Sequence, residues 1–260
     1  LLAARVLLLD GTLRTSMRDL GHPPLEVGEL AGRRVDVDVV GDVGATDRLS
    51  VSGLGALGHE AQPSLAGMLI PIDVHRLARE LSTSHEWADP VHLDVTGSTN
   101  VEAIERAQPW SPVLAELQTA GRGRLGRAWQ EVPRAGLAMS VLVPVIDRAG
   151  WLPLVAGLAV RGALEQHGVR AGLKWPNDVL LPDDEDRKVC GILCQLLPGG
   201  DGIVVGIGIN VHHDRDQLPV ATASSLRLVG AHVDRTALAA DVLRRLRALH
   251  EDLAAGEEQA

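Results

Sequence analysis

The sequence predicts an α+β protein in which a mixed or antiparallel sheet packs against helices. Two observations lead to this prediction. Strand-like apolar runs dominate the middle of the chain, whereas apolar residues with helical spacing precede and follow them. Hydrophobic residues also make up 45% of the 260 positions, so one large domain with a small one, or two modest domains, can bury a core.

The first 69 residues are expected to form a small module of their own, with an unknown role. Residues 34–40 alternate apolar and polar side chains as a half-exposed strand does, and residues 48–53 resemble a second, weaker strand. A β-rich fold therefore fits this module better than a helical one. The stretch at residues 62–71 is the expected boundary, which leaves residues 70–260 as the main domain.

Within the main domain, the spacing of apolar side chains predicts the helices and strands. Spacing close to 3.6 residues predicts a helix, and alternation or a short apolar run predicts a strand. The expected helices are residues 73–81, 100–107, 152–167 and 235–253. The expected strands are residues 91–95, 113–117, 137–144, 172–175, 179–181, 189–197 and 203–209.

Composition argues against several classes of protein. The formal net charge of −9 argues against broad, non-specific binding of nucleic acid. No apolar run approaches the roughly 18–20 residues that span a bilayer, and no secretory signal is evident, so we expect a cytoplasmic protein. Cys190 and Cys194 are the only cysteines and are expected to be buried, reduced thiols.

Lysine and asparagine are scarce in this chain. Lys174 and Lys188 are the only lysines among 25 Lys and Arg residues, and the only asparagines are Asn100, Asn177 and Asn210. Because Arg is a planar fork and Lys a compact ammonium, the few lysines mark places where Arg will not serve. All five residues fall within the motifs described next.

Three arginines and three glycines are interleaved in residues 121–127, the arginine loop. Glycine lets a backbone approach a ligand closely, and guanidinium groups suit phosphate. Arg122, Arg124 and Arg127 are therefore candidates for contacts with a phosphate-bearing ligand. A solvated basic turn, or a segment that binds RNA or a membrane, is the alternative. The spacing fits neither a dinucleotide-binding fingerprint nor a Walker loop.

Two lysine motifs follow. Residues 174–178 read Lys-Trp-Pro-Asn-Asp, in which Asp178 can hold a magnesium ion or orient Lys174. The alternative is a capped tight turn with Trp175 packed in the core. Lys188 precedes an apolar strand and is poised to point inward, where its ammonium can neutralise a carboxylate and a phosphate together. The acidic residues 183–186 are expected to be a solvated hairpin tip.

Polar residues and glycines complete the candidate site. Residues 96–100, Thr-Gly-Ser-Thr-Asn, can cap the next helix through Thr99 or Asn100, or bond the heteroatoms of a small ligand. Residues 206–211 form a glycine-containing strand end with Asn210, and such glycine often marks the close approach of a ligand or another backbone. His212 and His213 are expected in a surface turn rather than in a metal site.

Taken in order, five motifs resemble those of the biotin protein ligases, over residues 70–251. They are Ser-Thr-Asn at 98–100, Gln-x-Ala-Gly-Arg-Gly-Arg at 118–124, Lys-Trp-Pro-Asn-Asp at 174–178, Lys-x-x-Gly-Ile-Leu at 188–193 and Gly-x-Gly-Ile-Asn at 206–210. The resemblance implies a catalytic domain like that of class II aminoacyl-tRNA synthetases and a ligase that forms a carbon–nitrogen bond. Biotin and Mg-ATP would give biotinyl-5′-adenylate and pyrophosphate. A lysine of a biotin carboxyl carrier domain would then displace AMP.

The resemblance also implies a role for each motif residue. The implied catalytic residues are Lys188, Arg122 and Arg124, with Lys188 contacting the biotin carboxylate and the phosphate. The implied biotin-binding residues are Ser98, Thr99, Asn100, Gln118, Arg122, Gly123, Arg124, Lys188 and Gly191. The implied residues for ATP or the adenylate are Arg124, Arg127, Trp129, Lys174, Asn177, Asp178, Lys188 and Asn210, with Mg²⁺ on Asp178.

Three alternatives stay open. A lipoate–protein ligase shares the implied fold and adenylate chemistry, and a biotin-responsive repressor would need a basic recognition helix before residue 70. An inactive relative is the third, because many relatives carry a small β-barrel after the counterpart of residues 235–253. Leu125 also stands where many relatives carry Arg. A carrier protein is the expected partner, rather than DNA or a membrane, and a homodimer is left open.

Overall fold

The computed structural model describes residues 5–9, 12–16 and 70–258. Strands β1 (Arg5–Leu9) and β2 (Thr12–Ser16) pair antiparallel with each other. The strands predicted at residues 34–40 and 48–53 lie outside the described residues, as does the boundary stretch up to residue 69. The separate N-terminal module and its role therefore stay predictions.

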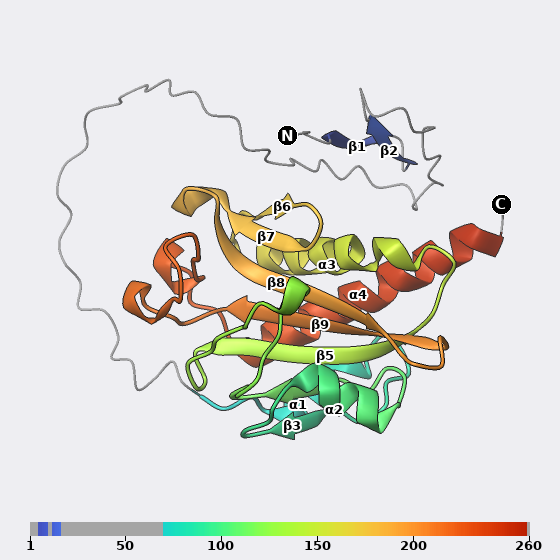
Figure 1. The fold of residues 1–260 in the computed structure, drawn as a ribbon, viewed down its shortest axis with the longest axis horizontal. Helices are drawn as coiled ribbons and strands as arrows, with labels where there is room; N and C mark the ends of the chain where they lie inside the picture. The colour runs from blue at the N-terminus through green and yellow to red at the C-terminus, as the bar shows by residue number, and fades with distance from the viewer. Residues whose placement is uncertain (1–4, 10–11, 17–69, 259–260) are drawn as a thin grey trace.

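A seven-stranded mixed sheet forms the centre of residues 70–258 (Figure 1). Its strands lie side by side in the order β3-β4-β5-β9-β8-β7-β6, and only β3 and β4 are parallel neighbours. The bounds are β3 (Val91–Leu93), β4 (Val113–Ala115), β5 (Gly136–Pro144), β6 (Gly172–Lys174), β7 (Asp178–Leu181), β8 (Arg187–Leu196) and β9 (Gly202–Asn210). The α+β prediction is confirmed, and all seven strands predicted within residues 70–260 are present.

Four helices accompany the sheet, as predicted. They are α1 (Val74–Leu81), α2 (Thr99–Arg106), α3 (Leu152–Gln166) and α4 (Arg235–Glu258). Asp73 caps α1, because its Oδ1 accepts a hydrogen bond of 2.8 Å from the backbone N–H of Arg76. The N-cap of α2 is Ser98, so the prediction of Thr99 or Asn100 was wrong. None of the helices that the structure describes is long and apolar enough to cross a membrane.

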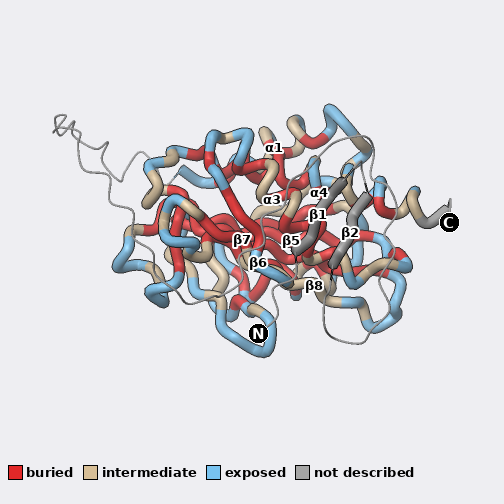
Figure 2. The backbone as a smooth tube through the Cα atoms, turned by 90° about the horizontal axis from the view of Figure 1, so that it is seen from above, coloured by how far each residue is buried: buried red, intermediate tan, exposed pale blue. Residues whose placement is uncertain are grey.

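The helices cover the two faces of the sheet unequally. Successive residues of a strand point to opposite faces. Val141 and Val205 belong to the main core with α3 and α4, whereas their neighbours Leu142 and Val204 pack with Ala103 of α2. Burial is concentrated in the sheet and in α3 and α4, with exposed loops around them (Figure 2). The α2 face is therefore only partly covered by helix.

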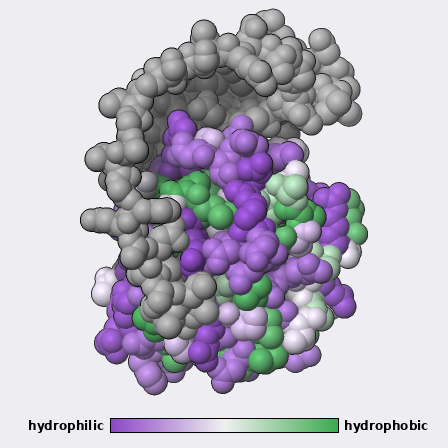
Figure 3. Space-filling model, turned by 90° about the vertical axis from the view of Figure 1, so that its left-hand side faces the viewer, coloured by the Kyte–Doolittle hydropathy of each residue, from purple (hydrophilic) through white to green (hydrophobic). Residues whose placement is uncertain are grey.

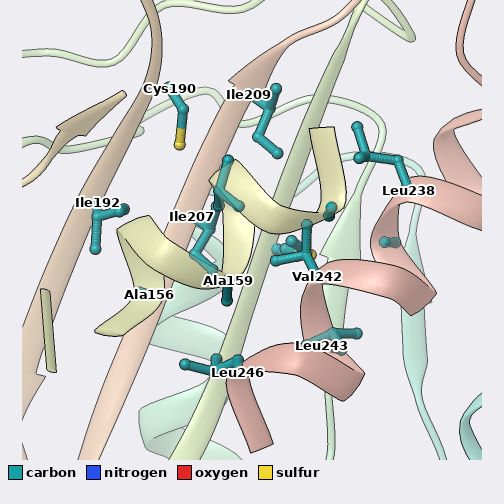
Figure 4. Close-up of a cluster of buried hydrophobic side chains, with 14 of the residues drawn as sticks. Ala156, Ala159, Cys190, Ile192, Ile207, Ile209, Leu238, Val242, Leu243 and Leu246 are labelled. Carbon is teal, nitrogen blue, oxygen red and sulfur yellow. The ribbon is translucent and has the colours of Figure 1, made fainter. Parts of the chain in front are cut away.

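The main core lies between the sheet and the pair α3 and α4. Ala156 and Ala159 of α3, Val242 and Leu246 of α4, and Ile207 of β9 point toward one another (Figure 4). Small residues on α3 let this helix lie close to both the sheet and α4. Both thiols are free, and the prediction of burial is confirmed for Cys190, whereas Cys194 is half-buried and packs against this core.

The expectation for the two histidines was wrong, because His212 and His213 are both buried. The chain after β9 folds back on itself: Ser225 Oγ donates to the His213 carbonyl at 2.6 Å, and Leu226 N–H donates to the Asn210 carbonyl at 3.1 Å. Both faces of the adjacent pair are thereby covered. Burial lowers the pKa of each imidazole to about 4.

Candidate active site

Three small residues line up across the sheet on the α2 face. Ala138 of β5 pairs with Gly208 of β9, which pairs with Gly191 of β8. We call these three residues the glycine floor. A Cβ atom at Gly208 would lie 2.6 Å from Trp129 Cε2, and one at Gly191 would lie 3.0 Å from Trp129 Cζ3. The indole of Trp129 therefore rests on the floor, and glycine is needed for it to do so.

A second row holds a buried polar cluster. Ser140 of β5 pairs with Gly206 of β9, and a Cβ atom at Gly206 would lie 2.0 Å from Asn100 Oδ1. Ser140 Oγ lies 2.6 Å from that same Oδ1, and Asn100 Nδ2 donates to Gln195 Oε1 at 2.6 Å. The hydrogen-bonding groups of the Asn100 side chain are therefore already paired with other residues of this protein. Its predicted contact with biotin stays a prediction, and the structure gives it a positioning role.

Neutral hydrogen-bonding groups gather beside this cluster at the start of α2. The backbone N–H and the hydroxyl of Thr99 both donate to Gln118 Oε1, at 2.9 and 3.1 Å. The Thr99 hydroxyl is thus hydrogen-bonded to Gln118 and does not cap the helix. The Ser98 hydroxyl has no hydrogen-bond partner among residues 70–258. The pair Ser98 and Gln118 can therefore present a donor and an acceptor to a neutral polar ligand.

Glu131 joins this group, and the sequence analysis missed it. Its Oε1 accepts hydrogen bonds from Trp129 Nε1 at 2.9 Å and from Gln118 Nε2 at 3.2 Å, and its Oε2 accepts from the Gln118 backbone N–H at 3.0 Å. Burial raises the pKa of the Glu131 carboxyl, and these hydrogen bonds oppose the rise. No motif or spacing singles out this residue, because its partners meet it only in the folded chain.

Lys188 lies at the edge of the glycine floor. Its Nζ is 2.6 Å from Asp178 Oδ1 and 5.8 Å from the centroid of the Trp129 ring. The Lys188 side chain is 34% exposed, so the ammonium borders solvent instead of pointing into the core. Asp178 pairs with Lys188 and not with Lys174, which is exposed, so that part of the prediction was wrong. Trp175 is also exposed and does not pack in the core.

The arginine loop, residues 121–127, is a hairpin-like turn with a closed base. Trp129 N–H donates to the Gly121 carbonyl at 2.9 Å, and Gly123 N–H donates to the Arg127 carbonyl at 2.7 Å. Leu125 at the tip has a φ of 59° and is 88% exposed. Arg122, Arg124 and Arg127 are exposed. Within the part of the chain that the structure describes, no carboxylate pairs with these three guanidinium groups, which are therefore available to an anionic ligand.

Backbone carbonyls in residues 222–225 accept hydrogen bonds from Lys188 and Asn210. Lys188 N–H donates to the Thr222 carbonyl at 2.8 Å, and Asn210 Nδ2 donates to the Ser224 carbonyl at 2.9 Å. Asn210 Oδ1 has no hydrogen-bond donor in residues 70–258 and stays available to a ligand. Asn177 Nδ2 donates to the Ile192 carbonyl at 2.8 Å, which ties the turn at residues 174–178 to β8.

The acidic tip at residues 183–186 differs in part from the prediction. Asp184 is mostly covered and accepts hydrogen bonds from Arg187 and Arg215 at 2.7 Å and from Ser224 Oγ at 2.5 Å. Burial raises the pKa of Asp184, but the Ser224 and Arg215 hydrogen bonds outweigh it and lower the value. The other three acidic residues are exposed. The described surface on this side of the molecule is mainly hydrophilic (Figure 3).

The described residues contain no ready-made metal centre. No group of three or more His, Cys, Asp or Glu side chains that can hold a metal ion occurs in the ranges the structure describes. Mg²⁺ is often bound by one or two carboxylates together with substrate phosphates. Asp178 fits that pattern as a single carboxylate, although it is already paired with Lys188.

Comparisons with known proteins identify the family of this chain. Residues 93–212 match the model of the biotin/lipoate A/B protein ligase family. The biotin–[acetyl-CoA-carboxylase] ligase of Mycobacterium tuberculosis is 36% identical over an alignment of 192 residues that covers 68% of this chain and 70% of that protein. The chain belongs to the biotin protein ligase family.

Solved structures of biotin protein ligases share the fold as well. The Aquifex aeolicus enzyme in complex with biotin and ATP matches with a TM-score of 0.56 and 34% identity, over 66% of this chain and 72% of that one. The Leishmania major enzyme in complex with biotinyl-5-AMP matches with a TM-score of 0.51 and 27% identity, over 65% and 75%. The predicted family and its fold are thereby confirmed.

The match to family members with a second activity is shorter. The bifunctional ligase/repressor BirA of Escherichia coli is 36% identical over an alignment of 171 residues that covers 61% of this chain but only 52% of that protein. This chain therefore spans about half the length of that relative. Before residue 70 the structure describes only the two short strands β1 and β2, so the recognition helix expected of a repressor is not tested.

Proposed function

We propose that this protein is a biotin protein ligase. It joins biotin to AMP with ATP and then transfers the biotinyl group to a lysine of a biotin carboxyl carrier domain. The observation that carries the proposal is the position of Lys188, whose ammonium borders the glycine floor between Asp178 and Trp129. Neutral groups of Ser98 and Gln118 and the exposed arginines come from the elements on the same side.

In the first step, a carboxylate oxygen of biotin attacks the α-phosphorus of ATP, and the bond from that phosphorus to pyrophosphate breaks. Both reactants are anions, so cations must offset their repulsion and stabilise the charge that develops during transfer. Lys188 would contact the carboxylate and the phosphate, and Arg122, Arg124 and Arg127, which have no carboxylate partner in residues 70–258, would contact phosphates. Ser98 and Gln118 would bond the ureido ring, Trp129 would pack near the adenine, and Asn210 Oδ1 would accept a hydrogen bond from it.

In the second step, the uncharged ε-amine of the acceptor lysine attacks the acyl carbon of the adenylate. The bond from that carbon to the AMP oxygen breaks, and the new amide nitrogen loses a proton to solvent. Water would compete for the same carbon, so the site must exclude it until the acceptor arrives. The arginine loop is suited to this task because it is exposed, rich in glycine and closed only at its base.

Mg²⁺ is proposed to enter with the phosphates of ATP. It would lower the negative charge on those phosphates, and Asp178 is the carboxylate of this site that fits it. The proposed roles of Lys188, Ser98, Gln118 and Asn210 do not depend on where the ion binds.

A lipoate–protein ligase is the rival within the same family. A dithiolane ring has no hydrogen-bonding ureido group, so the polar pair Ser98 and Gln118 favours biotin. The test is ATP–pyrophosphate exchange with Mg-ATP and either acid. Exchange driven by biotin and not by lipoate supports the proposal. Exchange driven by lipoate alone, or by neither acid, contradicts it.

A further inference from the structure

Glu131 connects the two ends of the candidate site. On one side it accepts from the backbone N–H and the side-chain amide of Gln118, whose Oε1 is held by Thr99. On the other side it accepts from the indole N–H of Trp129, whose ring rests on the glycine floor. One carboxylate thus has three N–H donors from two residues to which the proposed function gives different substrates.

These contacts also lie at the base of the arginine loop. A Cβ atom at Gly121 would lie 2.7 Å from the Trp129 carbonyl and 3.3 Å from Gln118 Nε2, so the chain segments before and after the loop are packed tightly together. The Trp129 N–H to Gly121 carbonyl hydrogen bond closes the loop. Glu131 then bonds Gln118, which lies just before this closure, and Trp129, which forms it. A substitution of Glu131 is therefore expected to shift the arginine loop together with Gln118 and Trp129.

We propose that Glu131 is a positioning residue that fixes Gln118 and Trp129 as one unit, so that the biotin side and the adenine side of the site are ordered together. This inference rests on the proposed function, which assigns Gln118 to biotin and Trp129 to adenine. Glu131 acts through these two residues, and we assign it no contact with the reacting atoms.

The chemistry of the donors requires a carboxylate at this position. All three groups that face Glu131 are N–H donors, and an ionised carboxylate is a pure acceptor. No lysine or arginine of residues 70–256 donates a hydrogen bond to it, so it is not one half of a salt bridge. A glutamine would keep the shape but turn its NH₂ toward at least one of the N–H groups. Glu131→Gln therefore removes the positioning with the least change in volume.

The experiment measures ATP–pyrophosphate exchange with Glu131→Gln in the full chain, varying biotin and ATP separately. Loss of hydrogen bonds to a charged group predicts that KM rises about tenfold for biotin and for ATP, with a smaller effect on kcat. Trp129→Phe keeps a ring but removes the indole N–H. Combined with Glu131→Gln, it should raise the ATP KM by less than the product of the two single effects.

Asp241→Asn is the matched control. Asp241 is a largely buried carboxylate of α4 that accepts from His167 and Arg244, on the other side of the sheet. Asp241→Asn should lower the melting temperature without changing the KM for biotin or for ATP. Glu131→Gln overturns the inference if it lowers the melting temperature and leaves both KM values unchanged, or if only one of them rises.

A second readout separates this inference from the proposed function. If the wild-type chain shows no biotin-dependent exchange, the proposed function fails, and amide hydrogen exchange of the free protein then tests the positioning alone. Faster exchange over residues 118–131 in Glu131→Gln than in the wild type and in Asp241→Asn supports it. Equal exchange in all three proteins overturns it.

Discussion

Lys188 has two neighbours that hold its ammonium beside the glycine floor. Asp178 pairs with it at 2.6 Å, and the Trp129 ring lies 5.8 Å away and rests on Gly191 and Gly208. Because Lys188 keeps a partly exposed ammonium, an incoming anion can take over the interaction that Asp178 supplies in the free protein.

Lys188→Ala should therefore abolish most adenylate formation. Removing a group that stabilises developing charge commonly costs about 10²–10³-fold in rate, and we expect a loss of that order in biotin-dependent ATP–pyrophosphate exchange. Arg170→Ala is the control, because Arg170 is exposed and pairs with the exposed Asp183. A normal exchange rate in Lys188→Ala would refute this role.

Arg124→Ala should act on retention of the adenylate. Arg124 lies in the exposed turn of the arginine loop and has no acidic partner in residues 70–258, so its removal costs little stability. We expect exchange to stay within about threefold, while released adenylate rises about tenfold for the loss of one charged contact. Filtration of a single-turnover mixture measures the released fraction. Retention equal to that of the wild type would show that Arg124 does not hold the intermediate.

Sequence reasoning located the residues that carry a motif and missed those that only folding brings together. Lys188 and Gln118 stand in recognisable motifs, whereas Glu131 is a single acid whose partner Gln118 is 13 residues away. The prediction for the histidines failed for a related reason. Adjacent residues alternate on an extended chain, but the return of residues 224–226 over His213 covers the side that was expected to face solvent.

At the scale of the element, β9 positions the site by having no side chains where other groups must lie. Gly208 leaves room for Trp129, and Gly206 leaves room for the amide of Asn100. The neighbouring odd-numbered residues Ile207 and Ile209 point into the main core. One strand thereby serves the core with one face and the site with the other.

Gly206→Ala should disturb this strand and the start of α2 together. The added Cβ would lie 2.0 Å from Asn100 Oδ1, so the hydrogen bonds of Asn100 with Ser140 and Gln195 must break or shift. Overpacking of this kind costs about 1–3 kcal/mol in the free energy of unfolding, which urea denaturation measures. At Gly150 an added Cβ meets nothing within 4 Å, so Gly150→Ala is the control. Equal stability of both variants would contradict the tight packing of Gly206 against Asn100.

The helices and strands were the most predictable level of the structure, because apolar periodicity records which face is buried. The ends of β3 and β4 were predicted less well. The strands predicted to reach residues 95 and 117 end at Leu93 and Ala115, and pairing resumes only at a single bridge between Thr96 and Gln118. Gln118 at this bridge is hydrogen-bonded with Thr99 and Glu131, and no periodic pattern contains these contacts.

At the scale of the whole molecule, the buried histidines make stability depend on pH. An imidazole with a pKa of 6.5 when unfolded and about 4 when folded binds its proton more readily in the unfolded chain between these values. The contribution of these two histidines to stability is therefore complete above about pH 6.5 and is lost as the pH drops toward 4. Glu131, with its raised pKa, opposes this trend, and carboxyls with lowered pKa such as Glu116 add to the loss below their usual range.

His213→Leu should flatten this dependence. Neither ring nitrogen of His213 has a hydrogen-bond partner among the described residues, so an apolar side chain can replace it. The difference between 6.5 and about 4 corresponds to roughly 3 kcal/mol per histidine. Denaturant unfolding at pH 7.5 and at pH 4.5 should show a smaller loss in the variant than in the wild type. The same loss in both proteins would show that the pKa of His213 is not lowered by folding.

The central claim is that the exposed arginines of the arginine loop and the partly exposed Lys188 bind biotin while it is joined to AMP. The most direct test incubates the full chain with biotin, Mg-ATP and a biotin carboxyl carrier domain and follows the intact mass of that domain. We expect one added biotinyl group on a single lysine, absent without ATP and formed about 10²–10³-fold more slowly with Lys188→Ala. An unchanged mass with the wild-type chain, or an equal increase with Lys188→Ala, would contradict it.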